Sequence, residues 1–189
     1  MPIVKTMRTF IAVELSEEQK NKLLELQQAI KKVGMQAKFV EKENIHITLK
    51  FLGEIEQKDL DIIKDSIEEA VQGIKSFQIS IKGVGAFPSL ARPRVIWADV
   101  EDGKDELIEL ANRIDEKVVL REFDKKPFSP HITVARLKTP KHIAALAEIE
   151  RDYEEFEFGK ITVSEVKIKE SELTPKGPIY RDLIFFGLE

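Results

Sequence analysis

The amino-acid sequence of 189 residues predicts one domain of mixed helices and strands, built from two similar halves. Three observations support this prediction. Apolar residues recur at helical spacing in four segments and alternate with polar residues in others. The order of these elements repeats along the chain. A short phrase, His-Ile-Thr followed by an aliphatic residue, occurs once in each half, at His46 and at His131.

Helical periodicity is found in residues 16–34, 57–72 and 104–120, and in a last segment that opens at 139–140. The first helix has a capping-box pattern in Ser16 and Gln19, and Gly34 is a stop signal at its end. The last helix is indicated by Thr139-Pro140, a cap residue followed by proline at the first helical position.

Strands are expected at residues 9–15, 46–52, 77–82, 95–100, 131–137, 161–168 and 179–188. In the strand at 77–82 the apolar residues alternate with polar ones, which is typical of a strand with one buried face. No Pro, Gly or Ser-rich linker divides the chain, and residues 83–93 are the nearest candidate for a hinge.

A duplication is predicted from the order of these elements. Strand, helix, histidine-motif strand, helix and strand describe one lobe at 8–82 and a second lobe at 94–168, followed by a C-terminal strand at 179–188. The offsets by subtraction are 86, 85 and 84 residues for the pairs Arg8–Arg94, His46–His131 and Phe77–Ile161. Two such copies pack most simply about a pseudo-twofold axis, which presents equivalent positions to one shared cleft.

The composition narrows the functional classes. Hydrophobic residues make up 42% and charged residues 34%, as in a globular protein, and the absence of cysteine excludes disulfides and thiolate metal sites. The lack of cysteine together with many Lys and Glu residues is typical of a thermophile. No apolar stretch has signal-peptide or bilayer-spanning length, so we expect a cytoplasmic protein. The formal net charge of -4 argues against a globally basic nucleic-acid binder, but not against a local basic cleft.

The paired motifs indicate phosphoryl chemistry. Because side chains alternate along a strand, His46 and Thr48 share one face, and His131 and Thr133 do the same. Of two imidazoles near neutral pH, one can take a proton from water while the other gives a proton to a leaving oxygen. Threonine hydroxyls can donate to the non-bridging oxygens of a phosphate. This set suits metal-free displacement at phosphorus, for which a strained 2′,3′-cyclic phosphate is a fitting substrate.

Other readings of these residues remain open. Duplication also copies structural histidines that have no catalytic role. A metal site is disfavoured because neither motif has an acidic residue nearby on the same strand face, and no cofactor-binding loop is present. Lys50 continues the face of His46 and either meets phosphate or is a solvated charge. Arg136 follows Thr133 by an odd number of residues and should face away unless the strand bulges there. His142 is expected at the surface.

The phrases HITL at His46 and HITV at His131 resemble the paired motifs of the 2H phosphoesterase superfamily. The flanking sequence is similar to its RNA 2′,3′-cyclic phosphodiesterase branch, long called 2′-5′ RNA ligase. The likeness runs through MRTFIAVEL, NIHITLKFLGE, FPSLARPRVIWA, FSPHITVARL and ESELTPKGPIYRDL. It implies a bilobal α+β fold in which each lobe is an antiparallel sheet backed by helices, with the active site in the central cleft.

The resemblance also implies the roles of single residues. It makes His46 the proton donor and His131 the proton acceptor, and it makes Thr48, Thr133 and Arg136 substrate contacts, without metal or cofactor. The product is a 2′-phosphomonoester, and the reverse reaction is 2′-5′ joining. We expect a monomer that acts on RNA ends with a 2′,3′-cyclic phosphate, tRNA fragments among them, or on nucleotides, and that does not bind membranes. Phe10 is expected in the core, with base stacking as its other reading.

Two rival functions fit the same motifs, because the motif strands recognise the phosphate and the loops recognise the rest of the ligand. One is a nucleotide- or RNA-binding module with little turnover, in which Thr48, Thr133 and Lys50 hold a phosphate. The other is a phosphodiesterase that acts on a small cyclic phosphate.

Overall fold

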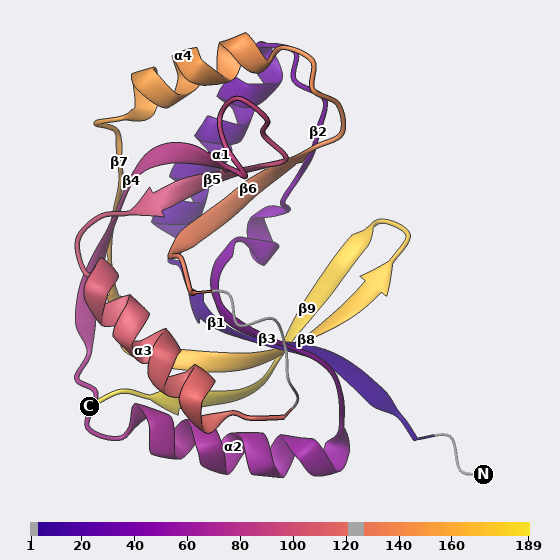
Figure 1. Ribbon diagram of the computed structural model, residues 1–189, viewed down its shortest axis with the longest axis vertical. Coiled ribbons are helices and arrows are strands. Elements are labelled where there is room, and N and C mark those ends of the chain that lie inside the picture. Colours follow the sequence, from indigo (N-terminus) through magenta and orange to yellow (C-terminus); the bar gives the residue numbers. More distant parts are fainter. Residues whose placement is uncertain (1–3, 121–126) are drawn as a thin grey trace.

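Nine strands form two antiparallel sheets among residues 4–120 and 127–189, which the computed structural model describes (Figure 1). The first sheet has the order β3-β1-β8-β9, formed by β3 (His46–Glu56), β1 (Thr6–Glu14), β8 (Glu165–Thr174) and β9 (Gly177–Gly187). The second sheet has the order β2-β6-β5-β4-β7, formed by β2 (Ala37–Phe39), β6 (His131–Leu137), β5 (Val95–Val100), β4 (Phe77–Phe87) and β7 (Glu157–Val163).

Each sheet is covered by two helices (Figure 1). Helices α2 (Gln57–Val71) and α3 (Lys104–Lys117) pack on the first sheet, and α1 (Glu17–Lys32) and α4 (Ile143–Tyr153) pack on the second. The contact follows from amphipathic patterning: in α2, Leu60, Ile63 and Ile67 are buried, while the residues between them are mainly polar and exposed. The prediction of a bilobal α+β fold is confirmed.

The two sheets have the same internal order. The order β3-β1-β8-β9 in the first sheet corresponds to the order β6-β5-β4-β7 in the second. By position, β3 is equivalent to β6, β1 to β5, and β8 to β4. In each half, the helix that follows the first strand packs on the opposite sheet. Helix α1 follows β1 but packs on the second sheet, and α3 follows β5 but packs on the first. The fold therefore has an internal repeat, and each half of the chain contributes to both sheets.

The boundaries of the lobes differ from the predicted segments 8–82 and 94–168. The first segment supplies β1 and β3 to the first sheet and β2 and β4 to the second, and the equivalent of β4 is β8. Phe77 was predicted to be equivalent to Ile161, but the strand equivalent to β4 in the other half is β8. The sequence reports the order of elements along the chain, but not which sheet each strand joins.

Some element boundaries also differ. The predicted strand at 161–168 is two strands, β7 and β8, separated at Ser164, and the first five residues of the predicted hinge belong to β4. The short β2 and the 3-10 turn η1 (Lys42–Asn44) were not predicted. Helix α4 begins at Ile143, so Thr139-Pro140 lies before it. Ser16 is the N-cap of α1, but its hydroxyl bonds the Gln19 side chain instead of a backbone N–H.

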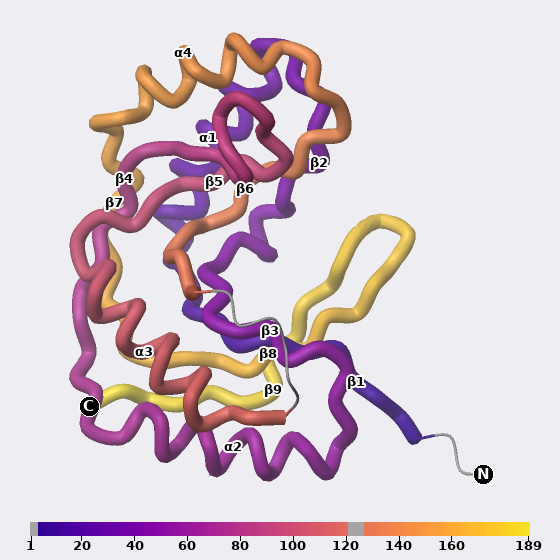
Figure 2. Tube along the Cα trace, in the orientation of Figure 1, coloured from indigo at the N-terminus to yellow at the C-terminus, as the bar shows by residue number. Residues whose placement is uncertain are grey.

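The β8–β9 hairpin extends outward from the body of the first sheet (Figure 2). Its outer part pairs Leu173 with Pro178 and Thr174 with Gly177. Within the described part of the chain, no helix combines the length and hydropathy that a membrane crossing needs.

Candidate active site

The two histidine motifs lie on equivalent strands that contact each other across the two sheets. His46 opens β3 and His131 opens β6, and β3 contacts β6. Each histidine faces a carboxylate residue across a strand pair, His46 opposite Glu14 and His131 opposite Asp99. His46 and His131 are 85 positions apart, and so are Glu14 and Asp99. The two motifs therefore occupy equivalent positions in the two sheets.

His46 is held in one orientation by two hydrogen bonds. Its Nδ1 lies 2.6 Å from the carbonyl oxygen of Asn44, and its Nε2 lies 2.7 Å from Oγ1 of Thr48. Because a carbonyl oxygen only accepts, Nδ1 carries a proton, and in the neutral ring Nε2 accepts from the Thr48 hydroxyl. Nε2 is therefore the nitrogen that is able to exchange a proton with a ligand.

His131 has the first of these two hydrogen bonds. Its Nδ1 lies 2.7 Å from the carbonyl oxygen of Ser129, two residues earlier, as Asn44 is for His46. The proton is therefore fixed on Nδ1 and Nε2 is again the reactive nitrogen. Thr133 lies two residues further along β6 and is half-buried.

Burial lowers the pKa of both imidazoles, since a charged ring loses hydration there. For His46 the carbonyl of Asn44 raises the pKa, the charge of Lys169 lowers it, and the charge of Glu14 raises it again. For His131 the carbonyl of Ser129 raises the pKa and the charge of Arg136 lowers it. Both rings are thus biased toward the neutral form, and a bound phosphate anion would favour protonation again.

Two aromatic side chains pack on His46. The Phe10 ring centroid lies 4.9 Å and the Tyr180 centroid 5.4 Å from that of His46. Phe10 is only 3% exposed. It is buried, as expected of a core residue, but its neighbours are His46 and Tyr180, so it supports the imidazole.

A different aromatic pair packs near His131. Phe87 lies edge-on at 4.9 Å and Trp97 at 6.4 Å between ring centroids. Trp97 lies opposite both Gly85 of β4 and Thr133 of β6. Tyr180, Phe87 and Trp97 were not predicted as site residues, because their strands pair with or lie near the motif strands only after folding.

A bulge in β6 decides the direction of Arg136. Trp97 pairs with Thr133 and the preceding Ile96 pairs with Ala135, which leaves Val134 as an extra residue. Arg136 then pairs with Val95, two residues before Trp97, and so shares the face of Thr133. The charge of Arg136 also lowers the pKa of Tyr180, against the burial that raises it. The charge of a residue of the second sheet therefore acts on the aromatic side chain that packs on His46.

One of two irregularities in β3 has the opposite effect on Lys50. Thr48 pairs with Ala12, but Lys50 pairs with Ile11, whose side chain is on the core face. Lys50 forms an ion pair with Asp115 of α3. The interpretation of Lys50 as a phosphate contact is therefore wrong, because the bulge reverses the alternation that it assumed.

Phe51 takes the position that Lys50 was expected to occupy. It pairs with Phe10, which shares the face of Ala12 and Glu14, so Phe51 lies on the side of His46. Its side chain is 66% exposed. Phe51 follows His46 by five residues, as Arg136 follows His131, so equivalent bulges present an exposed aromatic ring on one lobe and a guanidinium on the other.

A family model described as LigT like Phosphoesterase matches residues 13–97 and 99–180, and each matched segment contains one histidine motif. The chain belongs to the LigT-like phosphoesterase family. The resemblance inferred from the two motifs is confirmed.

Relatives of this LigT-like phosphoesterase cover nearly its whole length. A Methanothermobacter thermautotrophicus protein named RNA 2′,3′-cyclic phosphodiesterase is 38% identical over 183 residues, 96% of this chain and 99% of that protein. An Archaeoglobus fulgidus protein of the same name is 40% identical over 181 residues, with 95% and 99% covered. A crystal structure of a Thermus thermophilus protein superposes with a TM-score of 0.81 at 32% identity, with 96% of this chain and 98% of that chain covered.

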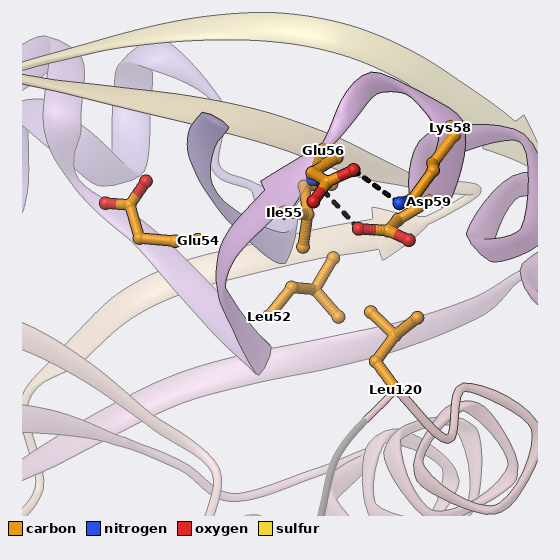
Figure 3. A pocket seen from close by; sticks show the side chains of 7 residues that line it. All are labelled: Leu52, Glu54, Ile55, Glu56, Lys58, Asp59 and Leu120. Carbon is orange, nitrogen blue, oxygen red and sulfur yellow. Dashed lines mark hydrogen bonds and ion pairs between the residues drawn. The ribbon is translucent and has the colours of Figure 1, made fainter. Parts of the chain in front are cut away.

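Two cavities of this LigT-like phosphoesterase lie away from both histidines. One, of about 210 Å³, is at the far end of β3 and is lined by Leu52, Glu54, Ile55, Glu56, Lys58, Asp59 and Leu120 (Figure 3). The Asp59 carboxylate there accepts from the Glu56 backbone N–H, so the acids cap α2. The other, of about 680 Å³, lies beside α2 and β9. Among the described residues no group of three or more His, Asp or Glu side chains is placed to hold a metal ion.

Proposed function

We propose that this LigT-like phosphoesterase hydrolyses RNA 2′,3′-cyclic phosphate ends to 2′-phosphomonoesters, with His46 and His131 as acid and base. The observation that carries the proposal is the matched pair of imidazoles on contacting strands, each with Nδ1 held by a backbone carbonyl, so that Nε2 is the nitrogen that can exchange a proton. Relatives at 38% and 40% identity are named RNA 2′,3′-cyclic phosphodiesterase, which supports the substrate class.

The proposed step is an in-line displacement. His131 Nε2 accepts a proton from water as its oxygen forms a bond to phosphorus, and the bond between phosphorus and the ribose O3′ breaks. His46 Nε2–H gives its proton to that O3′, so one proton enters and one leaves the pair. The same displacement with a ribose 5′-hydroxyl in place of water forms a 2′-5′ linkage, and the two histidines keep these roles: His131 takes the proton of that hydroxyl and His46 protonates the leaving O3′.

The remaining site residues steady the charge on the phosphate. Thr48 and Thr133 donate hydroxyl hydrogens to non-bridging oxygens, and Arg136 supplies a planar cation that can bond two oxygens at once. Protons and charge are then supplied by side chains alone, so we propose that no metal is required. Phe51, exposed on the same side as His46, offers a surface on which the terminal nucleobase can stack.

The test is an RNA that ends in a 2′,3′-cyclic phosphate, incubated with the protein in EDTA, followed by mapping of the product ends. We expect a 2′-phosphate on every product. His46→Ala and His131→Ala should each remove most turnover at a nearly unchanged melting temperature. His142→Ala is the matched control, because His142 is exposed and lies outside both motifs.

The outcomes separate the proposal from its rivals. Unchanged cyclic ends together with tight mononucleotide binding would favour a binding module. Turnover of small cyclic phosphates but of no RNA would favour the small-molecule phosphodiesterase. Activity retained in either histidine variant would refute the assigned roles. The monomeric state and the cytoplasmic location stay predictions.

A further inference from the structure

One face of the β8–β9 hairpin continues the active-site side of the first sheet. Lys169 of β8 pairs with Phe10, so it shares the face of the residues that surround His46. Side chains alternate along β8, and Ser171 and Leu173 therefore follow on that face. Ser171 pairs with Tyr180 and Leu173 pairs with Pro178. A continuous surface thus runs from His46 through Tyr180 to Leu173.

Two exposed aliphatic residues of the hairpin lie on opposite faces. Leu173 is 67% exposed and lies on the face of Tyr180, whereas Ile179 is 52% exposed and lies on the other face. Leu173 is one repeat of the pleat beyond Ser171, a step of about 7 Å along the strand. Leu173 is therefore about 7 Å further along the strand than the position opposite Tyr180. At this distance it suits the neighbour of the reacting nucleotide better than the reacting nucleotide itself.

Arg8 supplies a positive charge beside this surface. It lies two residues before Phe10 on β1 and so shares the same face; burial raises the pKa of Tyr180, and the charge of Arg8 opposes this rise. Its side chain is exposed, and within residues 4–120 and 127–189 it makes no ion pair within 4 Å, although Glu54 lies across from it on β3. An exposed guanidinium without such a partner is suited to an anionic ligand.

The carboxylates of the outer hairpin are sorted away from this face. Glu170 pairs with Arg181 and Glu172 pairs with Ile179, so both acids lie on the face opposite to Tyr180. Glu172 is further neutralised by an ion pair with Arg181. On the Tyr180 face the hairpin carries Asp182, two residues after Tyr180, and this carboxylate forms ion pairs with Lys167 and Lys169. A phosphodiester that approaches along Tyr180 and Leu173 therefore meets no unpaired carboxylate beside Tyr180.

The hairpin is fixed to the site through Asn44. The Asn44 side-chain Nδ2 donates to the carbonyl oxygen of Pro178 at 2.8 Å, and the Asn44 carbonyl accepts from His46 Nδ1. The residue that orients the proposed acid thus also holds the outer hairpin in place. A ligand on the hairpin would be positioned relative to His46.

We propose that Arg8, Tyr180 and Leu173 form a subsite for the nucleotide that precedes the reacting end of an RNA strand. Arg8 binds the phosphodiester on the 5′ side of the terminal nucleotide, and Leu173 supports the preceding base by apolar contact. The inference rests on the proposed function. It makes the enzyme prefer an oligonucleotide over a nucleoside 2′,3′-cyclic monophosphate.

The test compares kcat/KM for a nucleoside 2′,3′-cyclic monophosphate with kcat/KM for a short RNA that has the same terminal nucleotide. We expect the ratio of RNA to mononucleotide to fall about tenfold in Leu173→Ser and in Arg8→Gln, because each loses a contact that only the RNA makes. Ile179→Ser is the matched control, because Ile179 is also an exposed aliphatic residue but lies on the other face of the hairpin, and it should keep the wild-type ratio. Arg8→Gln should also reduce the slope of log(kcat/KM) for RNA against log[salt] by about 0.7, the value for one single-strand phosphate.

A wild-type ratio near one, or an equal fall in Ile179→Ser and Leu173→Ser, would overturn the subsite. If the wild-type protein turned over neither substrate, the proposed function would fail, and the subsite would be judged by binding. Fluorescence anisotropy with an RNA that ends in a 2′-phosphate should then show weaker binding for Leu173→Ser and Arg8→Gln than for Ile179→Ser. Equal affinities in all three variants would contradict the subsite independently.

Discussion

The Gly85→Ala substitution should disturb the active site through Trp97. A Cβ at residue 85 would lie 2.5 and 2.8 Å from Cζ2 and Cζ3 of Trp97, and closer still to Cη2, whereas ordinary contacts begin at 3.4 Å. The ring must therefore move by about 1 Å. Because it packs on Phe87 and near His131, the movement reaches the proposed base. Overpacking of this kind costs about 1–3 kcal/mol of unfolding free energy. A shift of about 1 Å at a catalytic group can lower the rate on the order of 10²-fold.

The assay is kcat/KM on an RNA with a 2′,3′-cyclic phosphate, together with the melting temperature. Gly187→Ala is the control, because a Cβ there meets no atom within 4 Å. In the double variant Gly85→Ala with Trp97→Phe, much of the activity should return, since phenylalanine lacks the three clashing atoms. If Gly85→Ala were as active and as stable as Gly187→Ala, the support of His131 by Trp97 would be refuted.

Three further predictions concern the charges of the site. Burial holds the pKa of both histidines below 6.5, so the free enzyme loses the proton of its acid as the pH rises. We therefore expect kcat/KM to be highest below pH 6.5 and to fall above it. An optimum above about pH 7.5 would contradict this. Lys50→Ala should leave kcat/KM unchanged and alter the unfolding free energy by at most about 1 kcal/mol in chemical denaturation, since its partner Asp115 is largely exposed; a large loss of activity would restore Lys50 to the site. Arg136→Lys should lower kcat/KM on the order of tenfold, because an ammonium lacks the planar fork of a guanidinium, and wild-type rates in this variant would exclude a two-point phosphate contact.

The helices, most strands and the two catalytic candidates could be predicted from the sequence, because their signals are local. Apolar spacing defines α2 within one residue of its observed end, and the repeated motif identifies His46 and His131. The order of elements also predicted a duplication. The helices and strands follow from apolar periods of 3.6 and 2 residues, which are present in the sequence before folding.

The exchange of strands between lobes could not be predicted in this way. Strand order in a sheet depends on which surfaces meet after folding, and β4 joins the second sheet although its predecessors β1 and β3 are in the first. The faces of Lys50 and Arg136 also depend on one extra residue in each motif strand. A bulge leaves no clear mark in a single sequence, yet it moves every later side chain to the other face.

The supporting aromatic residues were hidden for a related reason. Tyr180 lies more than 130 positions after His46 in the sequence, and it reaches His46 only because β9 and β8 bring it beside β1. The duplication did not help, because the rings that pack on His46 and His131 come from positions that are not equivalent in the two lobes. A symmetric motif is thus set in asymmetric surroundings.

The central claim is that His46 and His131 act together on one phosphorus atom. Its most direct test is an NMR titration of the three imidazole rings with inorganic phosphate. The resonances of His46 and His131 should shift together with a single Kd and one phosphate per chain, while those of the exposed His142 stay in place. Separate affinities for the two rings, or a response from only one of them, would contradict a shared site.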